Sequence, residues 1–521
     1  MKPSSMSGNS WRPIGMNGLT TNRWLVIVAF GWLAIFAGLG IKTVYNNRPE
    51  PKRPDDSRAT AFQFESDSGA TTLTRTQSCS TSNCHGSLTC DPNVQAIRRD
   101  ECYVWMDDPH AKASQTLLGK KSQEIFERLG LGTKLPPGKA ASEAEKKHWK
   151  NCQGCHDTNQ HLSGAAPLAD QANYFSEGVS CESCHGDSRE WLNLHVQDGW
   201  DKKTSTEEKH RLHFFAAGDV SGRVKRCAAC HVGGGEADVN HDLIAAGHPA
   251  LKFEYTWYLS RLPKHWKPSR TATNSLRSRE WFIGQLVTAI AALEQLEDRA
   301  NSCTVIGDTT QQSSWPELSE YNCFACHHDL TEPSWRQMRG FPGLDLTGKQ
   351  TGRLAMPWGS WSLELIQILA DEVNSSESNE FFTAFQQLDQ MLKQTEIPSA
   401  AQTSVQSRIV RDKLQTWLNC FQSNDMDTDR LLREIVLKQQ EKLVSSWDKT
   451  ASVLLGIATS HRDSKPFTEK LKTAMDRLRF PTAPTIIDSP RDFRSELIPN
   501  AMTGEDWGNL LKSLVESQTS P

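Results

Sequence analysis

The sequence predicts a mainly α-helical protein in which one N-terminal membrane helix precedes a loop-rich region and then a helical region. Three observations support this prediction: an uncharged apolar run near the N-terminus, repeated cysteine–histidine motifs between residues 79 and 343, and helical periodicity over residues 344–521. With 521 residues, the chain exceeds the roughly 100 to 200 residues of an ordinary domain, so two folded parts are expected. A formal charge of -4 provides no basic surface for a phosphate backbone, so nucleic acid is not an expected partner.

The N-terminus has the pattern of a membrane anchor. Residues 1–23 contain three basic residues and no acidic residue, and residues 24–41 form an uncharged apolar run that is just long enough to span a bilayer. The positive flank predicts that residues 1–23 lie in the cytoplasm. We therefore expect a single-pass inner-membrane protein with a linker at residues 42–78 and its folded domains in the periplasm. A cleaved signal peptide is the alternative, although no clean A-x-A site follows the run.

Four stretches match the pattern Cys-x-x-Cys-His. They are Cys152–Cys155–His156, Cys181–Cys184–His185, Cys227–Cys230–His231 and Cys323–Cys326–His327. This is the attachment signature of c-type haem, because two thiols must reach the two vinyl groups of one porphyrin and the next residue then supplies an imidazole to the iron. Zinc also binds Cys-x-x-Cys pairs, but it gives no reason for a histidine after every second cysteine.

A fifth stretch has a longer spacing. Cys79 and Cys84 are separated by four residues, and His85 follows directly. A longer loop can bulge outward while both thiols still meet the ring, so we expect haem here too, with a disulfide or a free pair as the alternatives. The sequence thus predicts about five covalently bound haem c groups.

Iron in a c-type haem usually takes a second axial ligand. The candidates that we favour are His110, His195, His241 and His248. Asp108 is suited to cap a helix that begins at Pro109, which gives His110 a rigid mount. His241 and His248 are seven residues apart and point roughly the same way if the intervening segment is helical. The weaker candidates are His161, His213 and His328.

The region after about residue 344 has no such motif and shows helical periodicity instead. Its apolar stripes are Ile409, Val410, Leu414, Trp417, Leu418 and Phe421, then Leu431, Leu432, Ile435 and Val436, then Val453, Leu454 and Ile457. Four or more antiparallel helices are expected, and residues 280–297 also read as a helix. This region is either a lid over the haem groups or a docking face. Of the remaining cysteines, Cys90 and Cys102 are expected to form a disulfide.

The motifs resemble those of a known family. The stretches Trp105-x4-His110-Ala-Lys-Ala, Gly178-Val-Ser-Cys181-Glu-Ser-Cys184-His185-Gly186 and Arg226-Cys227-Ala-Ala-Cys230-His231 are similar in order and spacing to the tetrahaem cytochrome c of nitrifying bacteria, which accepts electrons from hydroxylamine oxidoreductase. The similarity covers residues 79–235, and later segments resemble longer multihaem cytochromes of environmental bacteria. The resemblance implies electron transfer. It does not imply the nitrifier pathway, because the fifth motif and the C-terminal region would change the partner surfaces.

Two function classes fit these features. The first is a carrier or quinol-linked relay between redox proteins, and the second is an oxidoreductase for a small nitrogen or oxygen compound, which needs an iron with an open position. The carrier is favoured, and no catalytic residue is assigned. Four favoured distal candidates for five irons predict one open iron. The resemblance implies that it is the one at Cys152, Cys155 and His156, since the second haem of that family is five-coordinate.

Overall fold

The chain divides into two compact units, residues 1–70 and 71–521, and every residue described by the computed structural model belongs to the second unit. The described residues are 76–81, 84–86, 100–132, 135–138, 140–158, 177–200, 204, 206–215, 217–234, 237–266, 274–304, 315–321, 358–359, 361–393, 397–444, 447–460, 465–479 and 504–516. The predicted membrane run at residues 24–41 lies outside these ranges. Within them, no helix combines the length and apolar character that a bilayer crossing requires.

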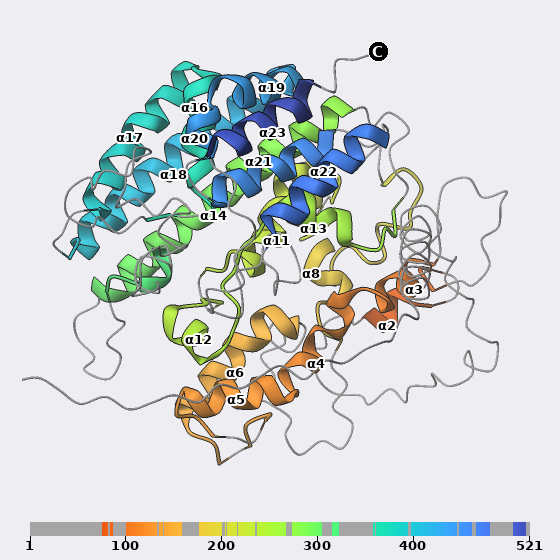
Figure 1. Cartoon of the computed structure of the whole chain (residues 1–521). Helices are drawn as coiled ribbons and strands as arrows, with labels where there is room; N and C mark the ends of the chain where they lie inside the picture. The colour runs from red at the N-terminus through yellow and green to blue at the C-terminus, as the bar shows by residue number, and fades with distance from the viewer. Residues whose placement is uncertain are drawn as a thin grey trace, which may run out of the picture. The chain divides into compact units, whose positions relative to one another are not determined.

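The described residues are mainly helical, which confirms the predicted fold class at that level (Figure 1). They contain no β-strand, and their β-bridges are isolated ones, between Gly234 and Ala237 and between Tyr321 and Trp358. The structure is therefore built from helices of very different length joined by irregular segments.

The part of the chain that carries the described motifs has short helices. They are α2 (Thr76–Cys79), α3 (Glu101–Met106), the 3-10 helix η2 (Pro109–Lys112), α4 (Ala113–Leu117), α5 (Lys120–Arg128), α6 (Glu143–His156), α8 (Cys181–His185), α10 (Thr206–Arg211), α11 (Val220–His231), α12 (His241–Ala246) and α13 (Tyr255–Arg261). We call residues 76–266 the motif region. Its separate apolar cluster is small and has three buried members among the described residues: Leu117, Phe126 and Trp149.

Three motif helices end at the motif histidine: α6 at His156, α8 at His185 and α11 at His231. Cysteines three residues apart in a helix lie on the same face, so each helix presents both thiols and the following imidazole together. The start of α6 is fixed by a capping box, in which the Ser142 backbone N–H donates to Glu145 at 2.7 Å. Local sequence thus shapes each motif before any cofactor is considered.

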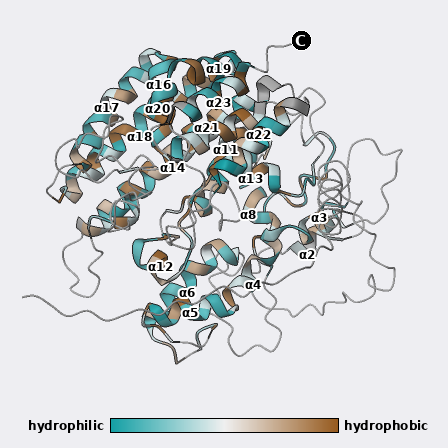
Figure 2. Cartoon of the chain, in the orientation of Figure 1, coloured by the Kyte–Doolittle hydropathy of each residue, from teal (hydrophilic) through white to brown (hydrophobic). Residues whose placement is uncertain are grey.

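The rest of the described chain consists mostly of longer helices, together with the short helices η3 and α20. They are α14 (Asn274–Thr304), the 3-10 helix η3 (Leu318–Glu320), α16 (Glu364–Val373), α17 (Ser376–Leu392), α18 (Ala400–Ser423), α19 (Thr428–Lys438), α20 (Gln440–Leu443), α21 (Trp447–Ser460), α22 (Lys465–Leu478) and α23 (Gly504–Glu516). We call residues 274–516 the helical region. Figure 2 shows apolar and hydrophilic residues alternating along these helices, as expected for helices with one face in a core.

The centre of this region is α14, which packs against α18, α21, α19 and α16. Trp281 on α14 is completely buried, and the α21 residue Gly456 lies against it. A Cβ atom at Gly456 would come within 2.5 Å of the Trp281 ring, so only glycine fits this close approach. The predicted helix at residues 280–297 is confirmed as part of α14.

The predicted apolar stripes lie on α18, α19 and α21, and their residues are buried with one exception. Ile409 is 43% exposed, because it lies beside the buried Val410 on the outer side of α18. The expected boundary between residues 343 and 344 stays a prediction. Helix α14 precedes this boundary in the sequence, yet it packs against α18, which follows the boundary. Helix α11 of the motif region also packs against α14.

Candidate haem centres

Each motif histidine of the described chain faces a second histidine ring. The four pairs are His85 with His195, whose ring centroids are 6.3 Å apart; His156 with His248, at 6.4 Å; His185 with His265, at 6.3 Å; and His231 with His110, at 6.0 Å. The first pair is nearly parallel, with an interplanar angle of 13°. The other three are nearly perpendicular, with angles of 85°, 74° and 81°.

These separations match the space that one metal ion occupies between two imidazoles. An imidazole nitrogen binds a first-row metal at about 2 Å, and the ring centre lies about 1 Å beyond the nitrogen, so two rings on opposite sides of one iron have centres about 6 Å apart. Two rings that only pack against each other need not keep their centres at this same distance in every pair. The residues present therefore fit haem iron with two axial histidines at all four described motifs.

Hydrogen bonds of the rings point to the same arrangement. In five of the eight paired histidines, Nδ1 contacts an acceptor: Glu101 for His85, Asp108 for His110, Thr116 and the Ala113 carbonyl for His156, the Leu192 carbonyl for His195 and the Pro249 carbonyl for His248. A ring that donates from Nδ1 keeps its lone pair on Nε2, which is the nitrogen left to bind iron.

Burial keeps several of these rings neutral. It lowers the pKa of His185 and of His231 to about 4, and it lowers the pKa of His156 and His248 as well. Burial acts this way because a charged imidazolium loses its hydration. By contrast, the hydrogen bond to Glu101 raises the pKa of His85. A neutral imidazole is the form that binds a metal, so these four rings are ready for ligation at neutral pH.

His110 is held by the structure that its sequence predicts. Asp108 caps η2 by accepting the His110 backbone N–H at 2.9 Å, and Pro109 occupies the first turn. The loop before the third motif then closes on this segment, since the Val179 backbone N–H donates to the His110 carbonyl at 2.9 Å. Gly178 adopts a φ of +67°, and a Cβ there would lie 2.4 Å from the same carbonyl oxygen. The glycine therefore allows the two segments to approach.

The cysteines of different motifs also meet. The Cys79 thiol interacts with Cys181, and the Cys155 thiol interacts with Cys230. The Cys230 thiol also donates to the carbonyl of Gly154, inside the second motif, at 3.9 Å. Cys184 lies close enough to Cys227 for an electrostatic interaction that adds to the effect of burial, and together these raise the pKa of Cys184 to about 12. These contacts place the described motifs in the spatial order first, third, fourth and second.

The facing pairs differ from the expected distal ligands in two ways. His248 faces His156, so the motif at Cys152 and Cys155 does not have the histidine-free distal side that we expected. His265 faces His185 and was not among the predicted ligands. It lies in the loop between α13 and α14, where no cap or motif marks it in the sequence. A search for every histidine after the fourth motif would have included it.

His241 begins α12, which ends at Ala246 and is followed by Gly247 with a φ of +122°. Because the helix stops before His248, the two histidines are not on one helical face, and only His248 pairs with a motif histidine among the described residues. The His241 backbone N–H donates to Glu317 at 2.8 Å. His241 thus lies at a different place from the four described pairs.

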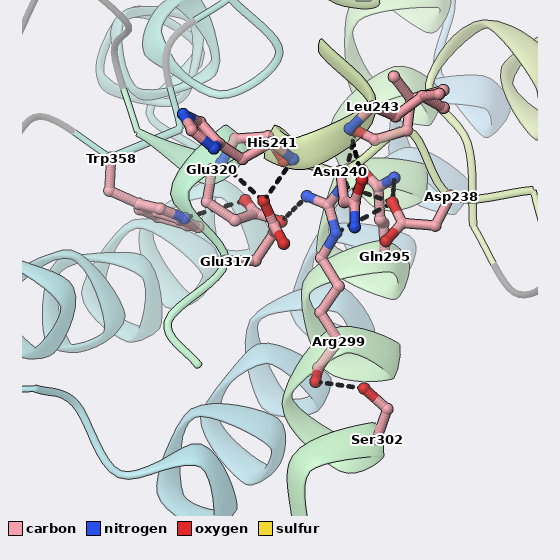
Figure 3. A network of polar contacts seen from close by, with 12 residues as sticks. Asp238, Asn240, His241, Leu243, Gln295, Arg299, Ser302, Glu317, Glu320 and Trp358 are labelled. Carbon is pink, nitrogen blue, oxygen red and sulfur yellow. Dashed lines mark hydrogen bonds and ion pairs between the residues drawn. The ribbon is translucent and has the colours of Figure 1, made fainter. Parts of the chain in front are cut away.

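A buried polar network surrounds the start of α12 (Figure 3). Arg299 of α14 donates to Asp238 at 3.2 Å and to Glu320 at 2.6 Å, and its side chain is only 10% exposed. Trp358 donates to Glu320 at 3.3 Å. Asp238 stands three residues before His241, and Glu320 stands three residues before Cys323. Arg299 therefore ties together the segments that lead into His241 and into the fifth motif.

Several predicted residues lie outside the described ranges, namely Cys323, Cys326 and His327 of the fifth motif, Cys90, His161 and His328. The disulfide between Cys90 and Cys102 therefore stays a prediction. His213 is described and has a left-handed backbone with a φ of +61°. Its ring belongs to none of the four facing pairs.

Comparisons with known proteins support a cytochrome relationship. Residues 78–186 match the family model described as cytochrome c554 and c-prime. Over 137 residues, the chain is 29% identical to cytochrome c-554 of Nitrosomonas europaea, a match that covers 26% of this chain and 54% of that protein. The chain thus spans about half the length of this relative, and no solved structure matches. Such a relationship implies covalently bound haem c. Over its motif-bearing N-terminal part, the chain is thus similar to the c-type cytochromes c554 and c-prime.

Proposed function

We propose that this chain is an electron relay in which all haem irons are six-coordinate. The observation that carries the proposal is the second histidine ring opposite each described motif histidine, at 6.0 to 6.4 Å. An iron with two axial imidazoles has no position left for a substrate, but it exchanges single electrons readily because its ligands stay in place. The alternative function, an oxidoreductase for a small nitrogen or oxygen compound, needs an open iron that the four pairs do not offer.

The contacts between motifs support a relay rather than isolated redox groups. Each thiol is an attachment point for a porphyrin, so the contact between Cys79 and Cys181 makes their two haems neighbours. The same argument applies to Cys155 and Cys230. Electrons then pass in the order first, third, fourth and second motif, or in the reverse order.

A fifth haem at Cys323, Cys326 and His327 belongs to the same proposal. We assign His241 as its second axial ligand. Support comes from Arg299, which binds Asp238 and Glu320 and so joins the chain segments just before His241 and Cys323. His248 follows α12 by two residues, so the short helix α12 links this ligand to the pair at the second motif. The second haem then lies inside the relay and not at its end.

The redox partners and the location of the chain are also proposals. We propose export to the periplasm, anchored by residues 24–41, with a quinol-linked or protein donor and a protein acceptor. Covalent haem attachment and the positive flank before the apolar run both support this topology. The mature protein should then sediment with membranes and keep its N-terminal residues. A soluble periplasmic protein whose N-terminus lies beyond residue 41 would contradict the anchor.

Electron paramagnetic resonance of the oxidised protein tests the relay. All irons should give low-spin ferric signals, and carbon monoxide should not change the spectrum of the reduced protein. Pyridine haemochrome analysis should give about five c-type haems per chain. A high-spin signal in the unmodified protein would favour the oxidoreductase function instead.

A variant locates the crucial ligand. The substitution His248→Ala should convert about one iron in five to the high-spin form and allow carbon monoxide to bind it, because it removes the ring that faces His156. His213→Asn is the control, since asparagine tolerates the left-handed backbone and His213 is in none of the four pairs. If His248→Ala stayed wholly low-spin, His248 would not be the ligand.

A further inference from the structure

The paired histidines differ in the charge of the group that accepts their Nδ1 hydrogen bond. At the first motif, His85 is bonded to the Glu101 carboxylate at 3.2 Å. At the fourth motif, the facing ring His110 is bonded to the Asp108 carboxylate at 3.0 Å. Each of these two rings thus has a charged acceptor on one side and faces a second histidine on the other, His195 for His85 and His231 for His110.

The second motif has neutral acceptors on both rings. His156 contacts the Thr116 hydroxyl at 3.0 Å and the Ala113 carbonyl at 3.3 Å, and His248 contacts the Pro249 carbonyl at 2.8 Å. Three of the four described pairs therefore fall into two classes, with a carboxylate at the first and fourth motifs and neutral oxygen atoms at both rings of the second.

The two carboxylates are shielded and held in place. The Asp108 side chain is 10% exposed, and its Oδ1 also accepts the His110 backbone N–H, so the hydrogen bond to the ring is built into the cap of η2. The Glu101 side chain is 20% exposed. It begins α3, which is fastened to His85 because the Cys102 backbone N–H donates to the His85 carbonyl at 3.0 Å. Partly buried charges interact more strongly than exposed ones, since water screens them less.

A carboxylate that accepts the Nδ1 proton of a ligand makes the imidazole more basic. A more basic ligand stabilises Fe(III) relative to Fe(II), and hydrogen bonding to the axial ligand is one of the ways in which proteins set the potential of a haem. Neutral carbonyl and hydroxyl acceptors have a smaller effect, because they carry no net charge.

We propose that Glu101 and Asp108 are positioning residues that lower the reduction potentials of the irons at the first and fourth motifs relative to the iron at the second. The inference rests on the proposed six-coordinate irons. It gives the relay an uneven energy profile, in which an electron shared by these three sites resides mainly at the second motif. Each site takes up one electron without a change of ligand.

Redox titration followed by electron paramagnetic resonance tests this. Glu101→Gln and Asp108→Asn keep an acceptor oxygen in place and remove its charge. We expect each variant to raise the reduction equilibrium constant of one haem about tenfold, which is 59 mV for a one-electron couple. The signals separate the sites, because nearly parallel rings, as in the pair with 13°, and nearly perpendicular rings give different low-spin spectra. Glu101→Gln should move the parallel type, and Asp108→Asn one of the perpendicular type.

Asp107→Asn is the matched control. It removes the same charge from the exposed residue next to Asp108, and so measures the effect of charge without the hydrogen bond to the ring. The absence of a shift in Glu101→Gln and Asp108→Asn, or an equal shift in Asp107→Asn, would overturn the inference while leaving the low-spin spectrum and the relay intact. A high-spin signal in the unmodified protein would instead overturn the proposed function, and the pairing with it.

Discussion

The motif region and the helical region of this protein are organised by different interactions. In the motif region, the longest described helix has 14 residues, the separate apolar cluster is small, and the recurring contacts join histidines and cysteines from distant segments. In the helical region, α14 has 31 residues and α18 has 24, and a continuous apolar core joins them. The first region keeps room between facing imidazoles, whereas the second fills its interior with side chains. We therefore expect bound porphyrins to take the place of a hydrophobic core in the motif region.

The largest expected effect comes from preventing haem attachment. Without porphyrins the motif region lacks the groups that fill the spaces between its paired histidines, so it should be cleaved by trypsin faster by an order of magnitude or more. A fragment containing α14 to α23 should persist, because most of the buried side chains in its core are its own; the motif region adds Val224, Ala228, Val232, Phe253 and Tyr255. Limited proteolysis with mass spectrometry of the two forms measures this. Similar cleavage of both regions in the haem-free chain would show that the comparison is wrong.

Two buried tryptophans test the comparison at single residues. Trp281 on α14 is 0% exposed and Trp149 on α6 is 1% exposed. Trp281→Ala should lower the free energy of unfolding by about 3–5 kcal/mol, through the cavity that it leaves, with unchanged haem spectra. Trp149→Ala should have a smaller effect on denaturant unfolding of the helical region and should change the spectrum of the haem near Cys152, which packs on the same cluster. Equal unfolding costs and equal spectra for both variants would contradict this division.

The smallest expected effect concerns Glu254, at the junction of the two regions. Phe253 stacks on His231, and Tyr255 packs against Gly284 of α14. Burial raises the pKa of Glu254 from 4.5 to about 6. Below pH 4.5 the carboxyl is protonated in both folded and unfolded states. As pH rises from 4.5 through 6, only the unfolded state ionises freely, so folding stability should fall by about 2 kcal/mol.

The substitution Glu254→Gln isolates this contribution. The difference in the free energy of unfolding between the variant and the unmodified protein should change between pH 4.5 and 6 and stay constant above pH 7. Denaturant unfolding followed by circular dichroism at several pH values measures it. A difference that does not depend on pH would mean that Glu254 has an ordinary pKa in the folded protein.

The sequence by itself determined the features that depend on near neighbours in the chain. The Cys-x-x-Cys-His motifs on α6, α8 and α11 each end a helix, and the caps of η2 and α6 involve residues two or three positions apart. The apolar stripe of α18 follows from a period of 3.6 residues. Ile409 was expected in this stripe but is exposed, since periodicity alone does not fix the edge of the buried face. These interactions are local, so the spacing of residue types is enough to predict them.

The tertiary structure decided which histidines face each other. His265 lies 80 residues beyond His185, and His231 lies 121 residues beyond His110, so nothing in the local sequence relates the members of either pair. His248 also lost its expected relation to His241, because α12 stops at Ala246. Pairing depends on how the loops between helices close in three dimensions. A histidine becomes a candidate ligand only if the fold places it opposite a motif histidine. The local sequence around it does not show this.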